Sequence, residues 1–510
     1  MESNLYFSAV NTGVPILSIL IFLPISGGAV LFFTGSEKFC RCWTLIITSC
    51  TALLSLTILP GFDRSTAKYQ FAEHHPWVDS LNINYTVGLD GISILLFLMT
   101  ALIMPFCVLA SWSYIKKRVR SFMLCLLVME TAMLGVFAAL DFVLFYILWE
   151  AMLIPMYLLI GIWGGPRRVY AAVKFFLYTL AGSILLLVAI IWLYIANDYS
   201  FFIPELMWQD YSRTAQLLVF GAFFLAFAIK VPMFPFHTWL PAAHVEAPAA
   251  GSVILASILL KMGTYGFLRF ALPITPLAAV QLLPGLLCLS ICGIIYGGFT
   301  ALAQQDMKKL IAYSSVGHMG FVALGIFVIN VRGIEGAILQ MINHGITTGA
   351  LFLCIGMIYE RTHSRELLSA TGIGKYMPVF ITFFTFFSLS SLAFPGTNSF
   401  VGEFMILAGA FQDNPLISYN IFLGMAAVPG AVLAAAYMLR MLQKVIWGGT
   451  KNPDQSWLTD INVREIITLA PFLIFVFWIG LAPGVFLDFI HTSVSTLALQ
   501  FHSHLGTAGL

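Results

Sequence analysis

Charged residues are scarce in this chain of 510 residues, and their scarcity excludes an ordinary soluble protein. Only 9% of the residues are charged and 60% are hydrophobic, with a mean hydropathy of +0.93. Soluble globular domains carry about 25% charged residues, so the composition predicts an integral membrane protein. The net charge is only +2, and no basic stretch interleaved with aromatic residues indicates nucleic-acid binding.

The sequence also lacks the motifs that hold redox or nucleotide cofactors. Of its eight cysteines, Cys288 and Cys292 are one helical turn apart, but a metal or iron–sulfur site needs more converging ligands. No glycine-rich nucleotide-binding loop is present. We therefore expect no cofactor and no metal in this chain. No short apolar segment at the N-terminus is followed by a small-residue cleavage site, so we expect no signal peptide to be removed.

Long apolar runs dominate the chain, and they predict an all-α integral membrane fold with fourteen transmembrane helices, since one span needs about 20 residues. The runs are 14–34, 41–60, 89–112, 121–140, 142–163, 171–195, 216–234, 250–270, 279–303, 309–330, 335–358, 378–410, 419–446 and 465–489. The seventh run contains Pro232, and the twelfth is long and contains Pro395-Gly396. Because proline interrupts helical hydrogen bonding, we expect helices 7 and 12 to be broken.

The loops alternate sharply in positive charge. One set holds only Arg64, Lys68, Arg213 and Arg332, with Arg269 at a helix end, whereas the other set holds most of the remaining lysines and arginines. The positive-inside rule places the basic loops in the cytoplasm or matrix and both termini outside.

Helices 4–8 and 9–13 form two related blocks of five, each with a proline-broken fourth helix. An odd number of helices inverts the second block relative to the first, and inverted repeats with broken helices are typical of transporters. The predicted domains are 1–120 (helices 1–3), 121–270 (first repeat), 271–447 (inverted repeat) and 448–510 (helix 14 and a C-terminal tail).

Four ionisable residues lie within apolar segments: Glu150, Lys230, Lys261 and Glu403. Charged groups are costly inside a membrane and usually mark a pathway for ions or protons. Glu130 and Glu150 flank a predicted turn near Asp141 at similar depth, where two carboxyl groups cannot both ionise easily. The alternative for either glutamate is a neutral side chain that hydrogen-bonds a neighbouring helix.

Lys230 directly precedes Val231-Pro232. The proline clashes with the carbonyl of Ala228, so we expect the helix to open there, free its carbonyls and admit water. An ion pair between Glu150 and Lys230 would be switchable by a proton arriving or leaving elsewhere. The alternative is a static pair that fixes helix packing.

Lys261 has no acidic neighbour in the sequence, and we interpret it as a proton relay. His318 and His344, on consecutive predicted helices, can pass a proton between their two ring nitrogens, and His244 is a candidate link. Each histidine alone could equally be a buried core residue. Glu403 would end this path as the donor to the outside.

Three segments together carry a family resemblance: AIKVPMFPFHTWLPAAHVEAPAAGSVILASILLKMGTYGFLRF, LIAYSSVGHMGF and FPGTNSFVGEFMIL. They resemble the antiporter-like membrane subunits of proton-pumping NADH–quinone oxidoreductase, respiratory complex I. An acid at position 403 and a chain that stops soon after helix 14 resemble the M type, called chain 4 in mitochondria. The resemblance implies that Glu150 and Lys230 form the family's essential pair and Lys261 its central lysine.

The resemblance further implies that Glu403 is the terminal acid and that the three histidines are polar axis residues; Glu130 matches a glutamate found in part of the family. It implies L-type and N-type neighbours, lipid, and NADH, FMN, Fe–S clusters and quinone bound by other subunits. The bacterial cytoplasmic membrane is favoured, with the mitochondrial inner membrane as the alternative. Rival interpretations are a Na⁺/H⁺ antiporter subunit, a ferredoxin-dependent plastid-type complex, and a structural spacer whose charges lock helices together.

Overall fold

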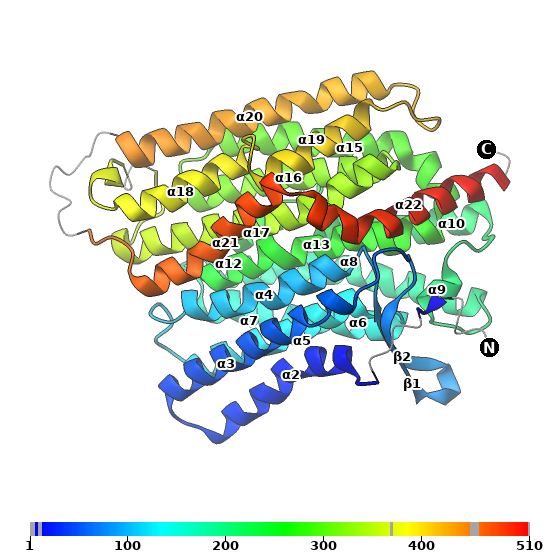
Figure 1. Cartoon of the computed structure of the whole chain (residues 1–510), viewed down its shortest axis with the longest axis horizontal. Helices are drawn as coiled ribbons and strands as arrows, with labels where there is room; N and C mark the ends of the chain where they lie inside the picture. Colours follow the sequence, from blue (N-terminus) through cyan, green and yellow to red (C-terminus); the bar gives the residue numbers. More distant parts are fainter. Residues whose placement is uncertain (1–5, 9–12, 368–370, 449–457, 508–510) are drawn as a thin grey trace.

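Apolar helices running between two ends of a bundle make up most of the computed structural model (Figure 1). The structure describes residues 6–8, 13–367, 371–448 and 458–507. The helices are α2 (Ile16–Val30), α3 (Glu37–Leu56), α4 (Ile94–Ala110), α5 (Val119–Ala138), α6 (Phe142–Ala151), α7 (Leu153–Trp163), α8 (Arg168–Ala196), α9 (Ile203–Leu206), α10 (Arg213–Lys230), α11 (Trp239–Glu246), α12 (Ala249–Ile254), α13 (Leu260–Gly266), α14 (Leu272–Ile274), α15 (Pro276–Ala303), α16 (Met307–Phe327), α17 (Val331–Thr362), α18 (Pro378–Ser391), α19 (Asn398–Phe411), α20 (Asn420–Trp447), α21 (Val463–Leu481) and α22 (Gly484–Thr507).

The helical membrane fold is confirmed. Within the described residues, 12 helical segments are long and apolar enough to cross a membrane. The third predicted run is the shorter α4, and the twelfth is the pair α18 and α19. The total of fourteen spans therefore stays a prediction, as does the division into inverted repeats.

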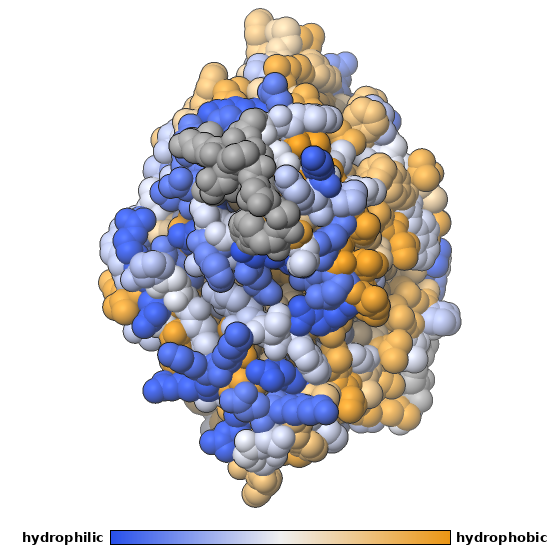
Figure 2. Space-filling view, turned by 90° about the vertical axis from the view of Figure 1, so that its left-hand side faces the viewer, coloured by the Kyte–Doolittle hydropathy of each residue, from blue (hydrophilic) through white to orange (hydrophobic). Residues whose placement is uncertain are grey.

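The two ends of the bundle carry different features. Both termini and the β-hairpin lie at the right-hand end in Figure 1, and the connection from α2 to α3 lies at the opposite end. Viewed from that opposite end, hydrophilic residues cover much of the surface, and hydrophobic residues gather along one flank (Figure 2). This arrangement fits helices that cross a bilayer. Which end faces the cytoplasm or matrix stays a prediction from the charges.

The β-hairpin is absent from the all-α prediction. Strands β1 (Gln70–Val78) and β2 (Ile83–Leu89) pair antiparallel, and Asn82 takes the left-handed conformation (φ 51°) that asparagine tolerates in turns. The carbonyl of Thr86 accepts a hydrogen bond from the N–H of Leu140 at 2.9 Å. The hairpin therefore fixes the turn between α5 and α6.

Both predicted helix breaks are present, and a third was not expected. The seventh span is α10 followed by α11, and the twelfth is α18 followed by α19. The fifth span is also divided, at Met152 between α6 and α7. Pro155 explains the division, because its ring cannot coexist with a helical bond to the carbonyl of Ala151. The irregularity lies next to Glu150.

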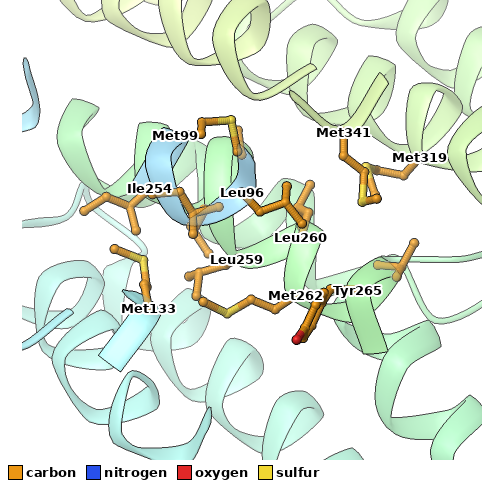
Figure 3. Packing of buried hydrophobic residues seen from close by; sticks show 14 of the residues in the cluster. Leu96, Met99, Met133, Ile254, Leu259, Leu260, Met262, Tyr265, Met319 and Met341 are labelled. Carbon is orange, nitrogen blue, oxygen red and sulfur yellow. The ribbon is translucent and has the colours of Figure 1, made fainter. Parts of the chain in front are cut away.

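Two short π-helices flank α13 in the eighth span: η4 (Leu255–Leu259) and η5 (Phe267–Ala271). Segments of this kind occur mainly as single turns within α-helices, often at functional sites. The span Ala249–Ile274 is the central one, since the whole of its most apolar window is buried. Apolar side chains of α4 and α5, including Leu96, Met99 and Met133, pack around η4 and α13 (Figure 3).

Arg269 on η5 was predicted only to mark a helix end, but its guanidinium is buried in an ion pair with Asp90, which precedes α4. Arg269 also donates to the hydroxyl of Tyr69 at 3.1 Å and of Tyr265 at 3.2 Å. These bonds tie the residues that flank the hairpin to the central span.

Candidate functional site

Lys261 occupies the first turn of α13, directly after η4, and is wholly buried. Its ammonium Nζ lies 2.6 Å from Nδ1 of His344 on α17 and also donates to the carbonyl of Ala256 within η4. A buried ammonium needs such partners, because an unpaired charge in a low-dielectric interior is strongly unfavourable. The structure therefore brings together two of the predicted site residues from different helices.

His318 continues the contact from His344. The two imidazole rings lie 5.7 Å apart between centroids. On its far side, Nδ1 of His318 is 2.8 Å from Oε1 of Glu403 on α19. Lys261, His344, His318 and Glu403 thus form a buried row that joins α13, α17, α16 and α19.

Glu403 has a second partner that the sequence analysis missed. The amide of Gln340 donates to Oε1 of Glu403 at 3.1 Å. Gln340 lies one turn before His344 on α17, so helical spacing could have found it. The hydroxyl groups of Ser391 and Tyr437 approach Nε2 of His318 at 3.4 and 3.5 Å, and no sequence pattern indicates these two contacts.

The break in the twelfth span is held by polar residues of α17. Asn343 donates to the backbone carbonyl of Asn398 at 2.8 Å, and Thr347 lies 3.2 Å from the side-chain oxygen of Asn398. Ser390 donates to the same oxygen at 2.6 Å. Asn343 and Thr347 therefore stabilise the start of α19, and through it the position of Glu403.

Glu150 and Lys230 are brought near one another but do not form an ion pair in the described structure. Each acts electrostatically on the other, yet Oε1 of Glu150 and Nζ of Lys230 have no hydrogen-bond partner among the described residues. Nζ of Lys230 lies 4.7 Å from the ring centroid of Trp149, a cation–π contact. The structure thus holds the predicted pair in an open arrangement.

The helix break after Lys230 differs in detail from the prediction. The carbonyl of Ala228 was expected to be freed, but it accepts the N–H of Met233 at 2.9 Å. The next carbonyl, of Ile229, accepts the indole N–H of Trp239 at 2.8 Å. Protein groups satisfy these two carbonyls, one of them through the side chain of the first residue of α11.

Glu130 and His244 stand outside the row. Glu130 is wholly buried in α5 with no hydrogen-bond partner for either carboxyl oxygen in the described chain, and its electrostatic neighbour is Cys107 of α4. No hydrogen bond joins the carboxyl groups of Glu130 and Glu150 in the described chain. His244 stacks on Phe352, with ring centroids 4.5 Å apart.

Known proteins place this arrangement in a family. The family described as "NADH:quinone oxidoreductase/Mrp antiporter, TM" matches residues 139–428. The chain is 44% identical to NADH-quinone oxidoreductase subunit M of Rhodobacter capsulatus over 96% of this chain and 98% of the relative. It is equally 44% identical to NADH-ubiquinone oxidoreductase chain 4 of Arabidopsis thaliana, with the same coverage.

A solved structure agrees with these relatives. A chain of respiratory complex I from Thermus thermophilus with bound NADH has a TM-score of 0.86 and 31% identity, over 95% of this chain and 99% of that one. The predicted resemblance to M-type, chain 4 subunits is confirmed. The chain is a member of the transmembrane family that NADH:quinone oxidoreductases share with Mrp antiporters.

Proposed function

We propose that this chain is a proton-translocating subunit in the membrane arm of a respiratory complex I. The buried row from Lys261 through His344 and His318 to Glu403 carries the proposal. Each member can hold a proton, and each lies next to the following member. Four such groups inside an apolar bundle are costly, and ionisable residues in membrane segments usually mark a pathway for ions or protons.

Glu150 and Lys230 would act as the switch of this row. In the open arrangement, Lys230 leaves its ammonium over Trp149 without a carboxylate contact. Closing the pair would bring a carboxylate against the ammonium of Lys230 and so weaken its field at Lys261 and the histidines. One charge moved against 100 mV requires about 2.3 kcal/mol, which is within the range that two unit charges at about 4 Å supply at an intermediate effective dielectric.

Other subunits would complete the enzyme. The relatives are named as subunits of NADH–quinone oxidoreductases, so we assign NADH oxidation, its cofactors and quinone reduction to partner chains. L-type and N-type subunits are the proposed neighbours in the membrane. The bacterial cytoplasmic membrane is the favoured location, with both termini on its outer side.

Substitutions at the switch test the proposal. Glu150→Gln and Lys230→Met each remove one charge with little change in shape, and we expect each to lower proton pumping by at least about tenfold, the scale of a lost proton-transfer group. Quinone reduction and acidification should be measured in vesicles containing the assembled complex. Lys38→Met, which removes an exposed lysine, serves as the control. Normal proton-to-electron ratios in both switch variants contradict the proposal.

An antiporter subunit is the second candidate, because the matching family includes Mrp antiporters. This candidate predicts sodium-dependent proton movement in vesicles that lack the quinone-reducing subunits. Proton movement that requires quinone reduction, and that sodium does not change, favours the complex I assignment.

A further inference from the structure

An apolar groove lies on one flank of the bundle, apart from the buried row. Its volume is about 270 Å³. Residues of α4, α17, α21 and α22 form its walls, and the chain that follows α3 closes one end. Arg64 is the one charged residue that the described chain contributes to this lining. Apolar cavities exclude water, so a hydrocarbon chain is the ligand that suits the groove.

The groove opens from the interior to the surface of the bundle. Ile342 and Ile346 on α17 are buried, whereas Leu56 and Trp478 in the same lining are 37% and 47% exposed. The helices α3, α4 and α21 lie toward the viewer in Figure 1, and hydrophobic residues gather on this side at the right of Figure 2. The opening therefore faces the hydrocarbon of the membrane.

The groove is about as long as one leaflet of a bilayer is deep. Along α4 it extends from Leu95 to Phe106, a rise of about 16 Å over eleven residues. The hydrocarbon core of a bilayer is about 30 Å thick, so one leaflet contributes about 15 Å. Leu95 lies at the end of α4 that the loop charges place outside. A single acyl chain of the outer leaflet therefore fits the groove along its length.

Two opposite charges stand at the outer end of the groove. The guanidinium of Arg64 lies 4.0 Å from the ring centroid of Phe489, which is itself part of the lining. Nη1 of Arg64 is 3.9 Å from Oδ2 of Asp488, and the two side chains are 46% and 65% exposed. Because an exposed ion pair at this distance is weak, both groups are available to a charged ligand.

We propose that this groove binds one phospholipid of the outer leaflet whose headgroup carries a primary ammonium, as in phosphatidylethanolamine. One acyl chain fills the groove, and the phosphate accepts hydrogen bonds from the guanidinium of Arg64, a donor pattern that matches phosphate oxygens. The ammonium donates to the carboxylate of Asp488. Trp478, near the outer end of α21, supplies the amphipathic ring typical of the membrane interface.

The headgroup chemistry distinguishes this lipid from its common alternatives. Phosphatidylcholine has a quaternary ammonium that cannot donate a hydrogen bond to Asp488, and phosphatidylglycerol has no cation to place there. The site also lies behind the row, because Ile342 and Ile346 are each two residues from His344 and so face the opposite side of α17. Lipid binding in the groove is therefore independent of proton transfer along the row.

A photoreactive phosphatidylethanolamine, with a diazirine near the end of one acyl chain, tests the site. The assembled complex is labelled in phosphatidylcholine nanodiscs, and mass spectrometry locates the adducts. We expect adducts at the deep end of the groove, on Phe106, Ile346 or Phe472. Unlabelled phosphatidylethanolamine should compete at least about fivefold better than phosphatidylcholine or phosphatidylglycerol, the scale of one hydrogen bond. Equal competition by the three lipids, or adducts at the outer end alone, overturns the proposal.

Substitutions at the mouth separate the two headgroup contacts. Arg64→Gln should lower deep labelling at least about fivefold through the lost phosphate contact, whereas Arg332→Gln, at another exposed arginine, should leave it unchanged. Asp488→Asn should retain labelling but lose the preference over phosphatidylcholine. Leu102→Trp, which fills the groove, should abolish deep adducts in complex that assembles normally on native gels. Unchanged labelling in Arg64→Gln, or a preference that survives in Asp488→Asn, contradicts the assigned headgroup contacts.

Discussion

At the scale of residues, the row depends on contacts between helices that are distant in sequence. Lys261, His318, His344 and Glu403 could be selected from sequence, because ionisable groups in apolar runs are conspicuous. The sequence also predicted that the histidines lie between Lys261 and Glu403. It could not predict that His344 contacts the lysine and His318 the glutamate, since side-chain packing between the helices sets these contacts. Tyr437 was missed because neutral polar residues are common in membrane helices, whereas the position of Gln340, one turn before His344, could have been found from helical spacing.

Glu403 gives the residue-scale test of the row. Glu403→Gln keeps an acceptor oxygen for Gln340 and His318 but removes the acid. We expect a loss of pumping of at least about tenfold with normal assembly, because the last group can no longer hold and release a proton. Proton uptake by vesicles measures pumping, and native gels measure assembly. Partial recovery in Glu403→Asp is expected, and unchanged pumping in Glu403→Gln is incompatible with a terminal acid.

At the scale of elements, helix breaks and close contacts between helices set the positions of Lys230 and Lys261. Proline positions predicted the breaks in helices 7 and 12, since the missing N–H acts locally. The break beside Glu150 follows from Pro155 by the same rule. The hairpin β1–β2 was not predicted, because its short strands lie in a polar connection without a clear alternation of apolar residues.

Gly263 tests the contact between α13 and α10. A methyl group at this position would lie 2.9 Å from the carbonyl oxygen of Phe227 and 3.0 Å from the N–H nitrogen of Val231. Backbone atoms cannot yield as a flexible side chain can, so Gly263→Ala should destabilise the fold by about 1–3 kcal/mol. Gly221→Ala, on α10 in open space, is the control. The temperature midpoint of thermal inactivation is measured for both variants of the purified complex. Equal midpoints for Gly263→Ala and Gly221→Ala argue against a close contact between α13 and α10.

Asp141 should make stability depend on pH at the turn before α6. Burial raises the pKa of its carboxyl to about 6, although the N–H groups of Asn84, Val143 and Leu144 oppose the shift. Because the folded pKa lies above the usual value of 3.8, this group's contribution is present below about pH 4 and is lost as the pH rises through about 6, on the order of 3 kcal/mol.

The measurement compares the unprotonatable Asp141→Asn variant with the unsubstituted protein. The unfolding midpoint of the unsubstituted protein should fall relative to the variant between about pH 4 and about pH 6. A constant difference across this range contradicts a raised pKa at Asp141.

At the scale of the whole molecule, one buried ion pair joins distant parts of the chain. Arg269 and Asp90 connect the hairpin and α4 to the central span, with Tyr69 and Tyr265 as further partners. The sequence predicted a membrane bundle from hydropathy, which sums over many residues. It could not predict this pair, because the partners lie 179 positions apart.

Removing one partner should harm the whole subunit. Asp90→Asn or Arg269→Met leaves a buried polar group without its counter-charge, at a cost of about 3–5 kcal/mol. The double variant should recover part of the loss. Native gels measure the amount of assembled complex in each variant. If the loss in the double variant is as large as the multiplied losses of the two single variants, the result contradicts pairing between Asp90 and Arg269.

The π-helix η4 has a consequence for how this span can vary. A π turn is equivalent to one extra residue placed in an α-helix, so η4 sets the angular phase of everything after it. If Leu255–Leu259 were wound as a regular α-helix with the same number of residues, Lys261 would rotate by about 100° about the helix axis. The ammonium would then face away from His344. Comparison of such spans between proteins by residue number alone would therefore align the wrong faces.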